Sequence, residues 1–208
     1  MKRLLPAPAV LALMVGTSPA LAGVELSPFA GFRMGGSFDI QTSAAQSDGE
    51  LEFKDTVSHG LVLNFDLQEA GKQGELYFGR QETTASIDNG LFAPGIQSID
   101  VTIYQLQFGG LYFPGGQTVG GFVSGVAGIT RLEPKASGLN NHHRASLSLG
   151  AGYKFPVTEH LRFRMDLRGI YTALDSGGSV FCSGGCEIRF RSSGYLQVEA
   201  SAGLVLRF

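Results

Sequence analysis

The last thirteen residues of the chain alternate between apolar side chains and side chains that are mostly polar or small. Side chains at positions i and i+2 lie on the same face of a β-strand, so this pattern predicts a strand with one apolar and one polar face. Its length exceeds the five or six residues that are typical of a strand in a soluble protein. The apolar set is Leu196, Val198, Ala200, Ala202, Leu204, Leu206 and Phe208, and the other set is Gln197, Glu199, Ser201, Gly203, Val205 and Arg207.

The same alternation recurs at residues 144–155 and 161–168, and at 60–67 with Val62 as the exception. Helical periodicity is absent over comparable lengths, and the 30 glycines argue against a helix-rich protein. We therefore predict an all-β fold. Its eight strands are expected near residues 24–37, 57–67, 75–84, 99–113, 118–131, 144–155, 161–173 and 190–208.

Short and long connections between these strands alternate strictly. The segments 68–74, 114–117 and 156–160 are short, whereas 38–56, 85–98, 132–143 and 174–189 are longer. This rhythm is typical of a transmembrane barrel, and most of the strands reach the 9–11 residues that a tilted strand needs to cross a bilayer. A soluble β-sandwich shows the same alternation and is the alternative. Aromatic residues near the short turns suggest an interfacial girdle: Phe65, Tyr77, Phe78, Tyr112, Phe113, Phe155, Phe163 and Phe208.

The N-terminus has the organisation of a secretory signal peptide. Lys2 and Arg3 precede an apolar stretch over residues 4–15, and Ala20-Leu21-Ala22 forms an A-x-A cleavage site before Gly23. We expect residues 1–22 to be removed, with cleavage between Ala22 and Gly23, and residues 23–208 to form one exported domain. A buried N-terminal helix is the alternative interpretation.

Three segments carry a resemblance to a known family: residues 27–33, 147–153 and 203–208. With the glycine-rich strands, they resemble the small outer-membrane β-barrel family of the OmpX and OmpA transmembrane-domain type, including bacterial barrels with a Cys-Ser-Gly-Gly-Cys loop. The resemblance implies an eight-stranded antiparallel up-and-down transmembrane β-barrel in the bacterial outer membrane, with short periplasmic turns and four longer external loops. It implies outer-membrane lipid and lipopolysaccharide as surroundings, and a monomer. Gly203, Leu204, Leu206 and Phe208 resemble the signal by which the barrel assembly machinery recognises its clients.

Charged residues share the polar face of several strands and are expected to point into the barrel. Because charges in a narrow lumen are costly unless they are paired, we predict mixed-sign networks with water. A plug of salt bridges is favoured over a conducting selectivity ring, since an eight-stranded barrel is just wide enough for its own side chains. The predicted lumen network is Arg33, Asp66, Glu75, Arg162, Arg164, Asp166, Arg168 and Glu199.

The histidines and nearby serines offer little for catalysis or metal binding. His142 and Ser146 share a face, but that face also carries Ser148 and points into the barrel, whereas His143 points away from Ser146. Adjacent histidines in an extended chain cannot easily chelate one ion. His59 and His160 are the remaining histidines. We predict no catalytic residue, no metal site and no cofactor.

Cys182 and Cys186 are the only cysteines and lie in the last long connection. An exported chain meets an oxidising compartment, so we expect an intraloop disulfide that shapes the loop and adds little stability.

The sequence favours a non-enzymatic outer-membrane barrel with an envelope role that displays loops for external contacts, whose partner is unknown. A narrow conduit for small or apolar solutes and a lipid A-modifying enzyme are the alternatives. A formal net charge of −2 makes nucleic-acid binding improbable.

Overall fold

The computed structural model of the chain describes residues 23–42, 48–87, 98–135, 141–174, 188–190 and 193–208. All regular structure in these segments is β-strand, and they contain no helix long and apolar enough to cross a membrane. The strands are β1 (Val24–Gly35), β2 (Ser37–Thr42), β3 (Asp48–Phe53), β4 (Thr56–Asp66), β5 (Lys72–Ile87), β6 (Ser98–Tyr112), β7 (Gly120–Pro134), β8 (His142–Pro156), β9 (Leu161–Ala173), β10 (Ile188–Phe190) and β11 (Gly194–Arg207).

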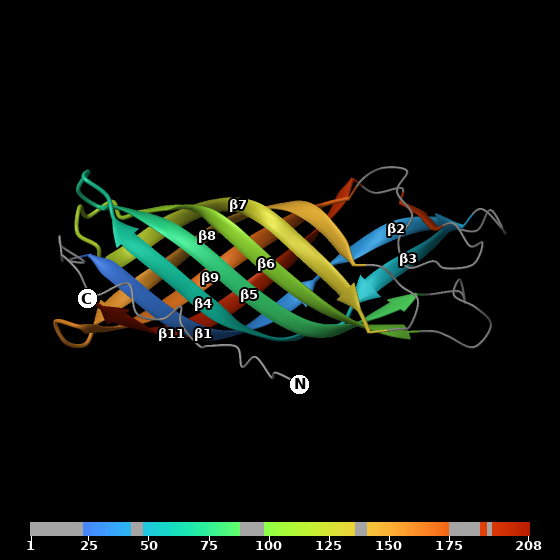
Figure 1. Cartoon of the computed structure of the whole chain (residues 1–208), viewed down its shortest axis with the longest axis horizontal. Helices are drawn as coiled ribbons and strands as arrows, with labels where there is room; N and C mark the ends of the chain where they lie inside the picture. The colour runs from blue at the N-terminus through green and yellow to red at the C-terminus, as the bar shows by residue number, and fades with distance from the viewer. Residues whose placement is uncertain (1–22, 43–47, 88–97, 136–140, 175–187, 191–192) are drawn as a thin grey trace, which may run out of the picture.

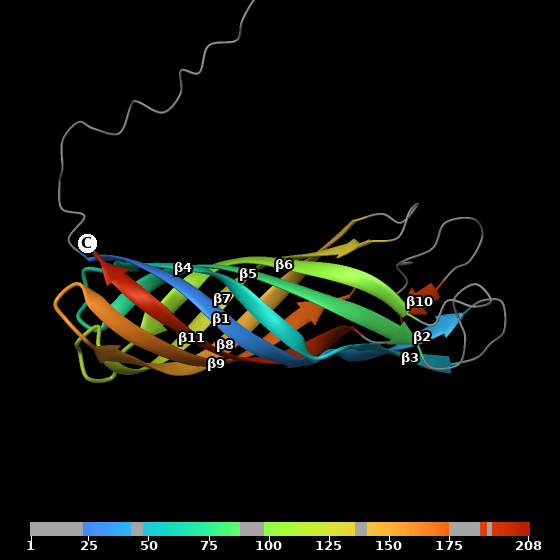
Figure 2. The same ribbon diagram turned by 90° about the horizontal axis from the view of Figure 1, so that it is seen from below.

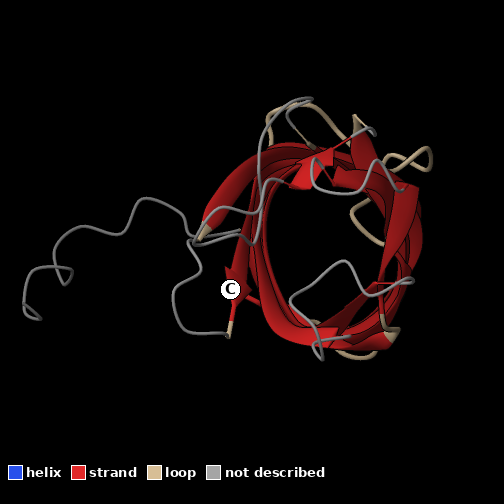
Figure 3. Cartoon of the chain, turned by 90° about the vertical axis from the view of Figure 1, so that its right-hand side faces the viewer, coloured by secondary structure: helices blue, strands red, loops and turns tan. Residues whose placement is uncertain are grey.

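Eight antiparallel strands close into a barrel, as the sequence predicts (Figure 3). The order around the barrel is β1, β4, β5, β6, β7, β8, β9 and β11, and β1 pairs with β11 to complete the ring. The strands run obliquely to the long axis (Figure 1). A row of paired residues that starts at His143 on β8 and follows the register around the barrel returns to β8 at Tyr153, ten residues further along. This stagger is the shear that accompanies a strand tilt of about 35–45°.

The predicted division into inner and outer faces is confirmed along the walls. On β8, the Ser148 side chain is fully buried inside the barrel, whereas the neighbouring Leu149 is 64% exposed on the outside. The outer surface is an apolar band, as expected for a wall that faces lipid. Exposed apolar residues occur on all eight barrel strands and include Phe32, Leu61, Phe78, Leu106, Ile129, Leu147, Leu167 and Leu204.

Glycines in the wall make room for aromatic rings on neighbouring strands. A Cβ on Gly74 would lie 2.0 Å from the ring of Phe65, and one on Gly152 would lie 2.4 Å from the ring of Phe122. Each ring therefore covers the backbone of the adjacent strand, which is a known way to fill glycine positions in curved sheets.

The two ends of the barrel differ. The short connections between β4 and β5, β6 and β7, and β8 and β9 lie at the same end as the C-terminus, whereas β2, β3 and β10 lie beyond the opposite end (Figure 2). In outer-membrane barrels the short turns are periplasmic and the longer connections are external. We name the two ends accordingly.

Two predicted long loops contain strands, which corrects the sequence-based prediction. The 38–56 connection contains β2 and β3, which pair with each other. β3 also pairs with the external end of β5. β10 lies in the 174–189 connection, extends to Phe190, and pairs with β2. β2 is a continuation of β1 after Gly35 and Gly36, both with positive φ, and this break hides the strand from a simple period-two reading.

The predicted aromatic girdle also needs correction at two positions. Tyr77 and Phe113 are each 1% exposed and lie inside the barrel. Tyr77 has the same parity as Glu75 on β5, so its side chain must point inward with that carboxylate. Tyr112, Phe155 and Phe208 lie outside and are 42–61% exposed.

Candidate functional site in the barrel lumen

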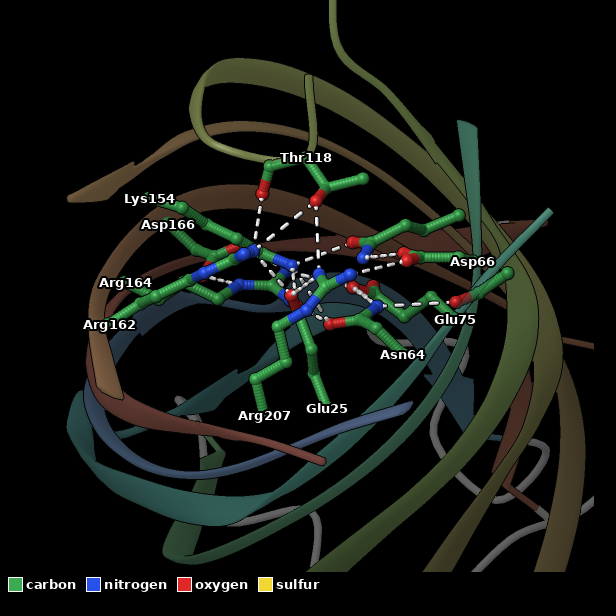
Figure 4. Close-up of polar contacts among 12 residues, drawn as sticks. Glu25, Asn64, Asp66, Glu75, Thr118, Lys154, Arg162, Arg164, Asp166 and Arg207 are labelled. Carbon is green, nitrogen blue, oxygen red and sulfur yellow. Dashed lines mark hydrogen bonds and ion pairs between the residues drawn. The ribbon is translucent and has the colours of Figure 1, made fainter. Parts of the chain in front are cut away.

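At the periplasmic mouth, charged side chains converge on one buried carboxylate (Figure 4). Glu25 accepts hydrogen bonds from Lys154 Nζ at 2.5 Å, Arg162 Nη1 at 2.5 Å and Arg207 Nη1 at 3.0 Å. Arg207 also donates to Asp66 Oδ2 at 2.7 Å. The carboxylate of Glu25 and the ammonium of Lys154 are both 0% exposed, so the centre of this group is shielded from solvent.

A second group lies further inside the barrel and centres on Glu75. Arg164 and Arg168 each place Nη2 2.8 Å from one oxygen of this carboxylate. Arg164 also makes two hydrogen bonds to Asp166, at 2.6 and 2.7 Å, and donates to Asn64 Oδ1 at 2.9 Å. The bidentate geometry with Asp166 is the arrangement in which arginine–carboxylate pairs are strongest.

A third group lies next to the second, further from the periplasmic mouth. Arg33 donates to Glu199 Oε2 from Nε at 3.1 Å and from Nη2 at 2.6 Å. The same carboxylate accepts from Ser58 Oγ at 2.7 Å and from Tyr77 Oη at 2.9 Å. The guanidinium of Arg168 lies over the Tyr77 ring, 4.5 Å from its centroid, and so links this group to the one below.

Several of these contacts cross the lumen, whereas Arg33 and Glu199 pair between the adjacent strands β1 and β11. Lys154 on β8 reaches Glu25 on β1, and Arg164 on β9 reaches Glu75 on β5, although neither pair of strands is adjacent in the sheet. The three groups together contribute six cations and five carboxylates, so their charges nearly balance. The arrangement is a cross-braced ionic plug, and a ring of one charge sign is not formed by these residues. The plug consists of Glu25, Arg33, Asp66, Glu75, Lys154, Arg162, Arg164, Asp166, Arg168, Glu199 and Arg207.

The external half of the lumen has a different lining. Gln107 donates to Ser146 Oγ at 2.9 Å and accepts from Ser148 Oγ at 2.6 Å, in a layer of uncharged polar side chains. In this layer the buried Gln105 amide has no hydrogen-bond partner among the described residues. Nearer the external end, buried side chains are mostly apolar: Leu51, Phe53, Val101, Ile103, Leu132, Leu174 and Tyr195.

The structure places all eight of the predicted network residues inside the barrel and brings them into contact through the plug. Three further members lie outside that predicted set, Glu25, Lys154 and Arg207, and the uncharged side chains of Asn64 and Tyr77 also hydrogen-bond to the plug. Strand parity already put Lys154 and Arg207 on polar faces. Glu25 and Asn64 also alternate with apolar neighbours. Applying the same period-two pattern up to the ends of each strand would have added them to the predicted lumen network.

The predicted histidine and serine candidates do not assemble into a reactive group. Ser146 and Ser148 contact Gln107 in the lumen, whereas His59 and His143 are exposed on the outer wall. His160 lies in a periplasmic turn with Nδ1 3.3 Å from the Arg207 carbonyl oxygen. Within the described segments, no group of three or more potential metal ligands occurs.

The C-terminal strand closes the barrel against both neighbours. β11 pairs with β1 on one side and β9 on the other, and Phe208 donates its backbone N–H to the Val24 carbonyl at 2.9 Å. Leu204, Leu206 and Phe208 face outward and are 44–61% exposed, and Gly203 lies against Pro28 and Phe29. The predicted leader up to Ala22 and the pair Cys182 and Cys186 lie outside the described residues.

Comparison with known proteins agrees with this architecture. The family model of the outer membrane protein beta-barrel domain matches residues 9–208. No curated protein sequence matches the chain. Among solved structures, Neisserial surface protein A (NspA) shares 13% identity with a TM-score of 0.54, over 90% of this chain and 98% of that one.

Two further barrels have similar scores. OprG from Pseudomonas aeruginosa shares 15% identity with a TM-score of 0.52, over 88% of this chain and 96% of its own. The outer membrane protein AlkL shares 11% identity with a TM-score of 0.51, over 100% of this chain and 97% of its own. At identities this low, the three likenesses show a common fold and leave activity to be argued from the residues.

Proposed function

The chain belongs to the outer membrane protein beta-barrel domain family and is an integral outer-membrane protein, and within that family we propose that it is a non-enzymatic barrel with an envelope role. In this proposal the membrane wall and the plug form a rigid support. The external strands and connections are the functional part, and they present a surface to partners outside the cell.

The observation that supports this proposal most directly is the ionic plug. Two of its ion pairs, Lys154–Glu25 and Arg164–Glu75, join strands that are not adjacent, and most of its side chains are less than 10% exposed. A solute that entered from outside would have to break several buried ion pairs to reach the periplasm, and each such break is costly. The barrel is therefore better suited to support than to passage.

The external end supports the same proposal. β5 extends to Ile87 and pairs there with β3, and β2 links β3 to β10. This extension, which comprises β2, β3 and β10, continues the sheet beyond the barrel (Figure 2). Backbone pairing between segments from the first and last external connections gives the extension a defined shape, which suits a surface used for contact.

Labelling of single cysteines in intact cells tests the display. In a background with serine at positions 182 and 186, Lys54→Cys at the β3–β4 turn is expected to react with a membrane-impermeant maleimide. Thr158→Cys in a periplasmic turn is the matched control, because both residues are exposed. The control is expected to react only after the outer membrane is permeabilised. Labelling of Thr158→Cys alone in intact cells would reverse the orientation and refute the proposal.

A narrow conduit is the second candidate, and the buried Gln105 amide, which has no hydrogen-bond partner in the described part of the chain, favours it. A buried amide of this kind needs water, so the middle of the lumen is a place where water or a small solute would reside. Conductance of the refolded barrel in a planar lipid bilayer separates the two candidates. We expect no steady channel from the wild-type barrel, and a reproducible conductance would favour the conduit.

A lipid A-modifying enzyme is the third candidate from the sequence. It would need a serine, a histidine and an acid at the lipid boundary. The serines nearest His142 and His143 point into the lumen instead, and their hydroxyl groups bond to Gln107. We therefore keep the non-enzymatic role as the proposal.

A further inference from the structure

One register row on the outer wall departs from the apolar pattern. His59, Arg80, Tyr104, Arg131 and His143 are paired one after another across β4, β5, β6, β7 and β8. His59, Arg80, Tyr104 and Arg131 alternate with buried lumen residues, and His143 has the same parity on β8 as the exposed Leu147 and Leu149, so all five point outward. We call this set the basic row.

On the periplasmic side of the basic row, the outer wall changes to apolar residues within a single row. The next outward row toward the periplasm is Leu61, Phe78, Leu106, Ile129 and Ala145, and it contains no polar side chain. Its four large members are 40–49% exposed, as residues that face hydrocarbon should be. The basic row therefore borders directly on the apolar band.

The basic row lies deeper in the membrane at its β4 end than at its β8 end. Rows run perpendicular to strands that tilt by about 35–45°, and strands are about 4.8 Å apart, so each step descends about 3 Å toward the periplasm. Arg80, three strands from His143, thus lies about 9 Å deeper. On β8 that level is reached near Leu147, which is 47% exposed and faces lipid. Arg80 and His59 therefore bring polar groups to a depth at which another part of the wall is apolar.

On the outer wall formed by the described parts of β4 to β8, acidic residues lie on the external side of the basic row. Glu82 and Glu133 belong to the next outward row, with Thr102 between them. Glu82 pairs with Arg80 and, at 3.5 Å, with Lys135, and Glu133 pairs with Arg131 at 3.4 Å. The groups closest to the hydrocarbon are thus cationic, aromatic or imidazole, without a carboxylate among them.

The basic row retains hydrogen-bond donors for a ligand. The Arg80 guanidinium is held by Glu82 and lies 5.8 Å from the centroid of the Tyr104 ring, which fixes its position while other N–H groups remain exposed. The Arg131 side chain is 41% exposed, and its ion pair with Glu133 runs through Nη2 at 3.4 Å. A phosphate at this level would receive charge-assisted hydrogen bonds from either guanidinium.

We propose that this face is a binding site for a phosphate-bearing lipid of the outer leaflet. The phosphate contacts Arg80 and His59 or Arg131, and the acyl chains lie against the apolar row that contains Phe78 and Leu106. Charge complementarity and the depth order of the rows favour this ligand, because a lipid also places its anionic group directly above its hydrocarbon. The inference rests on the outer wall and is independent of the proposed role of the external extension.

The chain has no tryptophan, so a single introduced Trp can report on this site. Phe78→Trp places the reporter one row below Arg80. Leu167→Trp on β9 is the matched reporter, because Leu167 is 57% exposed and belongs to a wall with no basic row among its described residues. Each protein is refolded into vesicles of brominated phosphatidylcholine, which quenches Trp fluorescence. Unbrominated diphosphoryl lipid A is then added and the relief of quenching is measured.

We expect lipid A to relieve quenching of the Phe78→Trp reporter with a relative binding constant roughly fivefold above that of the Leu167→Trp reporter, as one cation at a charged lipid surface would give. Arg80→Gln should remove this difference, whereas Lys72→Gln, which removes a cation paired with Glu69 at the periplasmic end, should not. Arg131→Gln provides a second variant, and retention of heat-resistant gel mobility checks that each barrel is folded.

Equal relief at both reporters, or an Arg80→Gln variant that behaves as the parent, would overturn the proposal. Self-association is a separate outcome. If the Phe78→Trp reporter were shielded from bromine without lipid A, and dilution of the protein in the vesicles restored quenching, a second copy of the chain would cover this face and the lipid assignment would be wrong.

Discussion

The pair of Arg33 and Glu199 offers the sharpest test of how the lumen stabilises the barrel. Both side chains are 0% exposed, and Glu199 is the only carboxylate that pairs with Arg33 among the described residues. Glu199→Gln keeps the shape of the side chain and removes its charge, which leaves the guanidinium buried without a counterion. Breaking a buried pair from one side costs about 3–5 kcal/mol. We expect the free energy of unfolding to fall by that amount.

Asp166→Asn is the matched control in the same lumen. It also removes one carboxylate, but Arg164 keeps Glu75 at 2.8 Å and Asn64 at 2.9 Å, and Arg168 keeps Glu75 at 2.8 Å. Because neither guanidinium loses all of its partners, we expect a smaller loss of about 1–2 kcal/mol.

A double-mutant cycle completes the test. Arg33→Met combined with Glu199→Gln removes both charges. The free energy of unfolding of this double variant should therefore fall by less than the sum of the losses in the two single variants, with a difference of about 2 kcal/mol or more. Urea titration of the refolded barrels in lipid vesicles measures all four free energies. If Glu199→Gln cost no more than Asp166→Asn, or if the two single effects simply added, lumen water would be screening the pair and a stabilising role for the buried ion pairs of the plug would be refuted.

Three other outcomes follow from the wall, the C-terminus and the cysteines. Leu149→Arg should cost about 2–4 kcal/mol in urea titrations, the range for a cation at the bilayer midplane, and Ser148→Arg, which points into the lumen, should differ from it; equal behaviour would contradict the observed parity of β8. Phe208→Ala should lower the amount of protein in outer-membrane fractions, and equal insertion would argue against the assembly signal. Cys182 and Cys186 should resist alkylation in the native protein without reductant, as mass spectrometry would show, and two alkylated thiols would exclude the disulfide.

The barrel wall could be predicted from the sequence because each strand separates two environments. Lipid outside and a polar lumen inside force the period-two pattern, so Leu149 and Ser148 differ in character although they are adjacent. The same parity placed Arg164 and Glu75 on inward faces. It could not say that they touch, because their contact joins β9 to β5 across the lumen and depends on the shear of the closed barrel.

The external extension could not be predicted for a different reason. β2 follows β1 after two glycines with positive φ, and β10 has three residues. Such short strands form because partners distant in sequence supply backbone hydrogen bonds, and no local pattern of side chains specifies those partners. Strand parity alone predicts that Tyr77 points inward. Its assignment to the aromatic girdle was wrong because it relied on proximity to a short turn instead of parity.

The layers of the lumen constrain where the protein can change shape. Cross-braces such as Lys154 to Glu25 fix the separation of opposite walls near the periplasmic end, so a change in barrel cross-section there would have to break buried ion pairs. The external half is held by weaker contacts between uncharged groups, such as Thr130 and Thr172 at 3.4 Å, and by apolar packing. Any adaptation to a partner is therefore less costly at the external end, beside the extension formed by β2, β3 and β10. A barrel used for surface contact requires a rigid periplasmic half and a more adaptable external half. If solutes had to pass into the periplasm, we would expect the periplasmic half to be the more adaptable of the two.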